Sequence, residues 1–296
     1  MRCLIVYNPV SGGSRKFINK LPSVIEKLKK KYDVIDIRAT NYAKEAIEIG
    51  KEACFKYDVL LVSGGDGTFS EVLQGIGGCS NPPILGYIPS GSCGDIANNH
   101  HIPHNIDKAI DLILKGNVKN IDLCKINDSY MSYIAGIGTY TAGVYNADQK
   151  LKRKIGKAAY VVSAIKETFN VKSYDLNIKV DNKSYKEKDC ILALVMNSKS
   201  VGGFAKFNKN AKLDDGKIDL VVVKKDYFNT PVNIWSVFVA GVENLKKFSS
   251  VKVYSGKNIC VDVKDKVLWN VDGDKSDYQN IEVNCLEKKI RMFVGE

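Results

Sequence analysis

Residues 62–76 read VSGGDGTFSEVLQGI. The apolar run Val59–Val62 predicts a buried strand that ends at the glycines. Beyond them, apolar residues recur at the spacing of one helix face, at Phe69, Val72, Leu73 and Ile76. Thr68 and Glu71 have the T-x-x-E spacing of a capping box at a helix start. The stretch therefore predicts a strand, a glycine-rich turn and a helix capped by Thr68 and Glu71.

The glycine-rich turn is suited to binding an anion. Gly64, Gly65 and Gly67 let the backbone approach a ligand closely, and N–H groups at a helix N-terminus form a phosphate site. The alternative is that Asp66-Gly67 is only a tight turn and Glu71 only a cap, and this stretch alone leaves both readings open. The turn lacks the Gly-Lys-Ser/Thr of a Walker A loop and the G-x-G-x-x-G of a dinucleotide site.

Two more glycine-rich turns follow predicted strands. YNPVSGG spans residues 7–13 after the first strand, and IPSGSCGD spans residues 88–95 after the fourth. Turns at the carboxyl ends of parallel strands lie at one edge of the sheet, where ligands bind. Three such turns at one edge favour a nucleotide phosphate site.

The two halves of the chain differ in pattern. Strands alternate with helical patterns up to about residue 124, which favours a Rossmann-like parallel α/β domain. From residue 125 to 284 most predicted strands follow one another, interrupted by helical patterns at 154–169 and 231–248, which favours an antiparallel β-sandwich or barrel. We expect a nucleotide-binding domain at 1–124, with a segment near 285–296 as its candidate completion, and a sandwich-like domain at 125–284.

Composition narrows the classes of partner. The 296 residues carry a formal charge of +11, which favours an anionic partner such as acidic lipid or a nucleotide. Nucleic acid is the weakest of these, because no basic motif interleaved with aromatic residues accompanies the charge. The apolar run in MRCLIVYNPV is too short for a signal peptide. The sequence also has no uninterrupted run of about 18 apolar residues, the length needed to span a membrane.

Cysteines and histidines give no metal pattern. The eight cysteines are scattered singly without zinc spacing, which favours reduced thiols in a cytosolic protein. His100, His101 and His104 cluster in one predicted loop without an acidic or cysteine partner at ligand spacing. We expect a loop there rather than a metal site.

The motifs together resemble the soluble bacterial diacylglycerol kinase family, whose catalytic domain is shared with sphingosine and ceramide kinases. The resemblance rests, in order, on NPVSGG, GGDGTFSEVLQGI, LGYIPSGSCGDIANNHHIP, GGFAKFNKNAKLDDGKIDL and NVDGD. GGDGT followed by Glu-Val is its most specific part. GGDGT alone is less specific, because NAD kinases and phosphofructokinases carry a related turn.

The resemblance implies ATP and Mg²⁺ as cofactors. It implies ATP contacts at Asn8, Pro9, Val10, Ser11, Gly12, Thr40, Gly65, Asp66, Gly67, Thr68, Phe69, Ser70, Glu71 and Ser92. It also implies that Asp66 is a catalytic residue in the phosphate and magnesium network. NAKLDDGKID resembles a structural magnesium site with the Asp215 carboxylate and the Lys212 and Lys217 carbonyls as ligands, for which a simple Asp-Asp-Gly turn is the alternative.

Two positions depart from the family pattern. Gly94 replaces the asparagine of G-T-x-N-D, so we expect the amide contact of that asparagine with the nucleotide or with Asp66 to be missing. Asp274 replaces the glutamate of D-G-E, the base that takes the proton of the substrate hydroxyl. Asp274 can be that base, but it is one methylene shorter, and a misplacement of about 1 Å costs roughly 10²-fold in rate.

We therefore expect a cytoplasmic, ATP-dependent lipid kinase, peripheral at the inner membrane surface. The basic segment QKLKRKIGK, residues 149–157, is a candidate contact with anionic lipid, and a solvated helix start is its alternative. Diacylglycerol is the family default acceptor, other lipids are open, and a homodimer is open. The competing readings are a nucleotide-binding regulatory protein and, last, an NAD kinase.

Overall fold

The computed structural model describes residues 1–91, 94–138, 172–204, 207–225, 240–265 and 267–296. These residues form two compact units. Unit 1 comprises Met1–Leu123 and Glu287–Glu296, and unit 2 comprises Cys124–Leu286. The predicted helix at 154–169, the first half of that at 231–248, and the basic segment 149–157 lie outside the described residues. The second half of the latter helix prediction contains the short helix α10 (Val242–Leu245).

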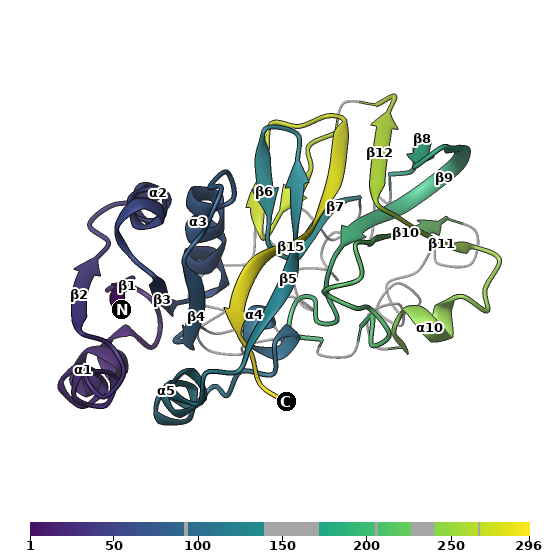
Figure 1. The fold of residues 1–296 in the computed structure, drawn as a ribbon. Helices are drawn as coiled ribbons and strands as arrows, with labels where there is room; N and C mark the ends of the chain where they lie inside the picture. Colours follow the sequence, from purple (N-terminus) through teal and green to yellow (C-terminus); the bar gives the residue numbers. More distant parts are fainter. Residues whose placement is uncertain (92–93, 139–171, 205–206, 226–239, 266) are drawn as a thin grey trace. The chain divides into compact units, whose positions relative to one another are not determined.

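Unit 1 is built on a parallel sheet with the strand order β2–β1–β3–β4 (Figure 1). The strands are β1 (Arg2–Tyr7), β2 (Val34–Ala39), β3 (Val59–Gly64) and β4 (Ile84–Pro89), and each neighbouring pair is parallel. The end of β15 (Ile281–Phe293) adds to β4, where Met292 lies opposite Leu85. The predicted parallel α/β class of the N-terminal half is confirmed.

Helices cover both faces of this sheet, with α1 (Ser14–Leu28) and α5 (Ile106–Lys115) on one face and α2 (Glu45–Lys56) and α3 (Asp66–Ile76) on the other (Figure 1). Alternate strand residues such as Cys3 and Leu61 pack with Phe17 of α1 and Ile110 of α5 in one core. The residues between them are buried as well, because a parallel sheet is covered on both faces. No helix within the described ranges is long and apolar enough to span a bilayer.

Helices α2 and α3 pack closely through two glycines. A Cβ placed on Gly75 would lie 2.3 Å from the carbonyl oxygen of Ile47 and 3.0 Å from the Cα of Gly50. Only residues without a side chain fit at this crossing. Four residues beyond each glycine, Cys54 and Cys79 form a disulfide with a Cα–Cα separation of 6.3 Å.

The expectation that all the cysteines are reduced thiols is therefore wrong for this pair. Their separation of 25 residues gives no sign of the bond, which depends on how closely α2 approaches α3. The other cysteines in the described part of the chain form no disulfide; they are Cys3, Cys124, Cys190, Cys260 and Cys285.

Unit 2 is an antiparallel β-sandwich region (Figure 1). It contains the end of β5 (Val118–Ile126) and the start of β15. Its other strands are β6 (Ser129–Met131), β7 (Ile134–Gly138), β8 (Tyr174–Val180), β9 (Lys183–Met196), β10 (Ile218–Lys224), β11 (Val251–Gly256), β12 (Asn258–Val263), β13 (Asn270–Val271) and β14 (Asp274–Lys275). The pairs β8–β9, β9–β10 and β12–β15 are antiparallel, and their inward residues surround the fully buried Trp269. The predicted class of the second half is confirmed.

Candidate functional site

The three glycine-rich turns meet at the carboxyl ends of the unit 1 strands. Ser90, at the start of the third turn, donates its N–H to the Gly64 carbonyl at 2.9 Å and accepts the N–H of Gly13 at 2.8 Å. Its hydroxyl lies 3.2 Å from that of Ser11. A Cβ on Gly91 would lie 2.5 Å from the Cα of Gly65, so these two backbones touch. The sequence prediction that the turns converge is confirmed.

Asn8 connects the first turn to helix α3. Its side-chain nitrogen donates to the hydroxyl of Thr68 at 3.3 Å, and its side-chain oxygen accepts the N–H of Val10 at 3.0 Å. The Asn8 amide therefore fixes the shape of the turn at residues 8–12 and its position against α3. Val10 itself is 82% exposed, and a Cβ on Gly12 would meet no atom within 4 Å.

Helix α3 begins at Asp66, with Gly65 as its N-cap, and no side chain caps it. The predicted capping box is wrong. Thr68 accepts from Asn8, and Glu71 accepts the backbone N–H of Lys44 at 3.3 Å. The first-turn N–H groups of α3 are therefore left to an anion or water, since a helix start has N–H groups with no partner inside the helix.

Open space surrounds the second residue of α3. A Cβ on Gly67 would meet no atom within 4 Å, and its φ is not positive. Neither packing nor backbone conformation explains glycine there, whereas close approach of a ligand would. Gly64 differs, because its Cβ would lie 2.6 Å from the Cβ of Thr68.

Asp66 is held by the start of the short helix α4 (Asp95–Asn99). Its carboxylate accepts the N–H of Asp95 at 3.0 Å and that of Ile96 at 3.2 Å. Burial, and next the charge of Asp95, raise the pKa of Asp66 above its ordinary value, against the opposing effect of these hydrogen bonds. A buried carboxylate with a perturbed pKa at a ligand-binding edge is typical of a functional site.

The other predicted contacts in unit 1 differ in exposure. Thr40 follows β2 and donates its N–H to the Tyr7 carbonyl at 2.9 Å, which places it beside the first turn. The ring of Phe69 is buried against Tyr87, with ring centroids 5.2 Å apart, so only its backbone is available to a ligand. Pro9 and Ser70 lie in the first turn and in α3, and Ser92 lies outside the described residues.

In unit 2, Asp274 lies on a two-residue hairpin. Val271 pairs with Asp274, and the loop residues Asp272 and Gly273 have φ of 52° and 99°. Asp-Gly with two positive φ angles is the preferred sequence for such a turn. Asp274 is exposed on β14.

The Asp272 carboxylate fixes this hairpin to the start of β7. It accepts N–H groups from Ser132, Tyr133 and Ile134 at 2.6, 3.0 and 3.1 Å, and the Ser132 hydroxyl at 2.7 Å. NVDGD thus forms an Asp-Gly hairpin turn, which the Asp272 carboxylate fixes in place and which carries the predicted base Asp274.

The predicted magnesium segment forms a turn. Asp215 accepts the N–H of Lys217 at 3.1 Å, and Gly216 between them has φ of 72°. Asp215 and Lys212 are exposed. No group of three His, Cys, Asp or Glu side chains able to hold a metal occurs within the described ranges. A site made of one carboxylate and two carbonyls does not require such a group, so its occupancy stays a prediction.

Comparison with known proteins identifies the family. Residues 2–126 match the diacylglycerol kinase catalytic domain, and residues 135–294 match the YegS C-terminal NAD kinase beta sandwich-like domain. A diacylglycerol kinase of Staphylococcus saprophyticus is 33% identical over 274 residues, which cover 92% of this chain and 88% of that protein. The chain belongs to the diacylglycerol kinase family.

Further relatives agree with this diacylglycerol kinase family assignment. The diacylglycerol kinase of Bacillus subtilis is 32% identical over 276 residues, covering 92% of this chain and 89% of that protein. A crystal structure of a diacylglycerol kinase from Bacillus anthracis has a TM-score of 0.83 at 26% identity, covering 99% of this chain and 97% of that one.

One departure from the family pattern has a structural reason. Gly94 adopts φ of +70°, and a Cβ there would lie 2.3 Å from the Cε1 of His104. Asn98, on α4, is the hydrogen-bond partner of that ring at 3.2 Å. In this diacylglycerol kinase family member, glycine at 94 is therefore matched to a histidine packed on the turn.

Sequence reasoning missed three residues that hold the predicted site residues of the two units in place. Asp95 and Tyr87 both lie against Asp66, the Tyr87 hydroxyl being 3.5 Å from its carboxylate, and Asp272 anchors the hairpin. The motifs that contain Asp95 and Asp272, at residues 88–95 and 270–274, are local in sequence, but the partners of these two side chains are distant.

Proposed function

We propose that this chain transfers the γ-phosphate of ATP to a hydroxyl group of a lipid, with diacylglycerol as the first acceptor to test. The observation that carries the proposal is the uncapped start of α3, with open space at Gly67. Such a helix start binds phosphate through backbone N–H groups. Membership of the diacylglycerol kinase family supports both donor and acceptor class.

In this proposal, unit 1 holds the phosphates. The first turn of α3 supplies N–H groups, and the turn at Asn8–Gly12 lies beside it and is held in register by Asn8. Because phosphoryl transfer depends on positioning and electrostatics more than on covalent chemistry, a rigid cradle is the main requirement.

Asp274 is the candidate general base. It would accept the proton of the lipid hydroxyl as the oxygen attacks the γ-phosphorus and the bond to the β-phosphate oxygen breaks. Its exposure leaves the carboxylate accessible to a substrate, and the Asp272 anchor limits its movement.

Magnesium bound with the nucleotide would neutralise charge on the transferring phosphoryl group. Asp66 is the candidate member of this network, since it directly follows the carboxyl end of β3 and backbone N–H groups hold its carboxylate in place. Asp215 suits a hard cation, with one oxygen accepting from Lys217 and an exposed carboxylate. The basic surface supports action at an anionic cytoplasmic membrane face.

The test is transfer of labelled γ-phosphate from ATP to a panel of lipid hydroxyls presented in mixed micelles, with NAD as a further acceptor. We expect phosphorylated diacylglycerol or a related lipid from the wild type, and a strong loss of product from Asp66→Asn and Asp274→Asn. Full activity in both variants would refute their roles, and product from NAD alone would refute the lipid acceptor.

A second function, a nucleotide-binding protein with little kinase activity, is favoured by the short side chain of Asp274. Calorimetry separates the two: ATP binding without turnover on any lipid supports this alternative. Gain of activity in Asp274→Glu would show that the missing methylene limits an otherwise competent site.

A further inference from the structure

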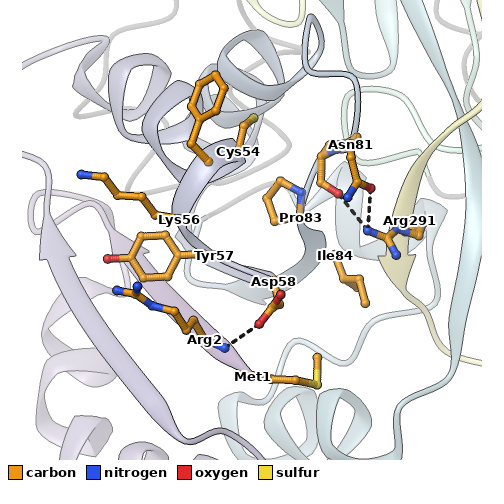
Figure 2. Close-up of a pocket in the computed structure, with 12 residues that line it drawn as sticks. Met1, Arg2, Cys54, Lys56, Tyr57, Asp58, Asn81, Pro83, Ile84 and Arg291 are labelled. Atoms are coloured by element: carbon orange, nitrogen blue, oxygen red, sulfur yellow. Dashed lines mark hydrogen bonds between the residues drawn. The ribbon is translucent and has the colours of Figure 1, made fainter.

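A pocket of about 440 Å³ lies at the edge of unit 1 where its parallel strands begin. Its lining includes Arg2 at the start of β1, Asp58 before β3 and Ile84 at the start of β4 (Figure 2). The glycine-rich turns follow the opposite ends of these strands. The pocket is therefore separate from the predicted nucleotide site.

One wall of this pocket is Cys54 of the Cys54–Cys79 disulfide (Figure 2). Both cysteines are half-buried. Among the described cysteines outside the disulfide, Cys3, Cys124, Cys190 and Cys285 are buried and Cys260 is half-buried. Of the two half-buried cysteines of the disulfide, Cys54 is the one that lines the pocket.

The opposite wall carries a cation without a carboxylate partner. The Arg291 guanidinium donates to the side-chain oxygen of Asn81 at 3.2 Å and to the Pro82 carbonyl at 3.1 Å, both neutral acceptors (Figure 2). Arg2 and Lys56, which also line the pocket, have Asp36 and Glu52 within ion-pair distance. Within the described part of the chain, Arg291 has no carboxylate within 4.0 Å, so its charge is available to an anionic ligand.

A second cation lies beside Cys79. The Lys289 ammonium donates to the Cys79 carbonyl at 2.6 Å. A nearby cation stabilises a thiolate, and the sulfur with the more stable thiolate leaves faster in disulfide exchange. Cys54 lies in the last turn of α2 and Cys79 follows the end of α3, so both cysteines are near helix C-termini. Lys289 therefore favours Cys79 as the leaving sulfur.

We propose that the Cys54–Cys79 disulfide is a thiol–disulfide exchange site whose reaction partner is a low-molecular-weight thiol carrying carboxylate groups. The thiol enters the pocket with a carboxylate on Arg291, and its thiolate attacks the sulfur of Cys54. A new S–S bond joins the thiol to Cys54 as the Cys54–Cys79 bond breaks, and Cys79 leaves as a thiolate beside Lys289.

A second molecule of the same thiol completes the reduction. Its thiolate attacks the sulfur of the first thiol, which releases Cys54 as a thiolate and forms the oxidised small disulfide. Two electrons pass from the two thiols to the protein, and their protons go to solvent or to the cysteine thiolates. The reaction opens a loop that contains β3 and residues 62–76.

Glutathione, with two carboxylates, is the probe, and uncharged 2-mercaptoethanol is its comparison. The full chain, isolated without reductant, is treated with each thiol, quenched by alkylation and mapped by mass spectrometry. We expect the linked Cys54–Cys79 peptides at the start, then a glutathione adduct on Cys54 with Cys79 alkylated. An adduct on Cys79 would overturn the assignment, as would two free thiols that glutathione disulfide cannot oxidise.

Charge variants test the role of the pocket. Arg291→Gln should slow exchange with glutathione about tenfold, the effect of one charged hydrogen bond, and leave the 2-mercaptoethanol rate within about twofold. Lys289→Gln should slow both reactions. Lys16→Gln on α1 is the matched control and should change neither. Equal effects of Arg291→Gln on both thiols would overturn carboxylate recognition. No kinase assay enters this test, so its result and that of the proposed function are independent.

Discussion

The carboxylate of Asp66 accepts the backbone N–H of Asp95 at 3.0 Å. The two residues are 29 positions apart and belong to different glycine-rich turns, one after β3 and one after β4. The bond therefore ties the GGDGT turn to the third turn. Both side chains are acidic, and the charge of Asp95 opposes ionisation of Asp66.

This arrangement predicts a pH dependence of stability. The folded pKa of Asp66 is raised above its ordinary value of 3.8, so between the two values the folded state holds a proton that the unfolded state has lost. The contribution of Asp66 to the free energy of unfolding should fall as pH rises through that window, and then level off.

Urea unfolding of the wild type and Asp66→Asn, from about pH 3.5 to pH 7, measures the effect as the difference between the two curves. Taking the difference between the two curves cancels the contribution of the other carboxyl groups to the pH dependence, several of which have lowered pKa values. Curves that stay parallel over the whole range would contradict the raised pKa.

Gly75→Ala should destabilise the protein by about 1–3 kcal/mol, because its Cβ would overlap the Ile47 carbonyl at the crossing of α2 and α3. Gly67→Ala is a matched control on the same helix. Its Cβ meets open space, and alanine favours a helix by up to about 1 kcal/mol. Thermal and urea unfolding should rank the proteins with Gly75→Ala last, and equal stability of the two variants would refute the close crossing.

The same Gly67→Ala variant tests the phosphate cradle. If a phosphate approaches the backbone at residue 67, the added methyl group occupies its place, and ATP affinity should fall about tenfold by calorimetry, or roughly 1.4 kcal/mol. Glu26→Ala on α1, away from the glycine-rich turns, is the control and should keep the ATP affinity of the wild type. Wild-type ATP affinity in Gly67→Ala would place the nucleotide elsewhere.

Substitutions of Asp272 and Asp274 should differ in their effect on the free energy of unfolding. Asp272→Asn keeps a residue that tolerates positive φ but loses charged acceptors for four donors, so we expect a loss of about 2–4 kcal/mol in unfolding free energy. Asp274→Asn, at an exposed position, should change stability by less than about 0.5 kcal/mol.

Asp274→Asn should lower the rate of lipid phosphorylation although it leaves stability nearly unchanged. Removal of a general base costs about 10²-fold or more, so Asp274→Asn should lose lipid phosphorylation at temperatures where it is fully folded. An Asp274→Asn protein that is both stable and active would contradict its role as base, and an Asp272→Asn protein as stable as the wild type would contradict the anchor.

Local patterns predicted the parallel sheet, the sandwich region and the meeting of the three turns. Strands β1, β3 and β4 are short apolar runs followed by turn residues, and such runs need no distant information. Helix α5 likewise has local start and stop residues. The Asn105 side chain caps its start by accepting the N–H of Lys108, and Gly116 ends it with φ of 79°.

The errors came from contacts between distant residues. Thr68 has the right spacing for a cap, but Asn8 occupies its hydroxyl from 60 residues away, and the helix starts earlier at Asp66. Cys54 and Cys79 pair because Gly50 and Gly75 let two helices touch. Asp272 binds Ser132 across 140 positions, which no local spacing reveals.

The return of the chain to unit 1 at Glu287 has a consequence for synthesis. A ribosome must translate more than 160 residues of unit 2 before the segment that pairs with β4 exists. At about 5–20 residues per second, the nascent sheet keeps an unpaired edge at β4 for roughly ten to thirty seconds. Unpaired edges invite wrong pairing. The part of the protein that is made first is thus completed last, which exposes it to chaperones throughout translation.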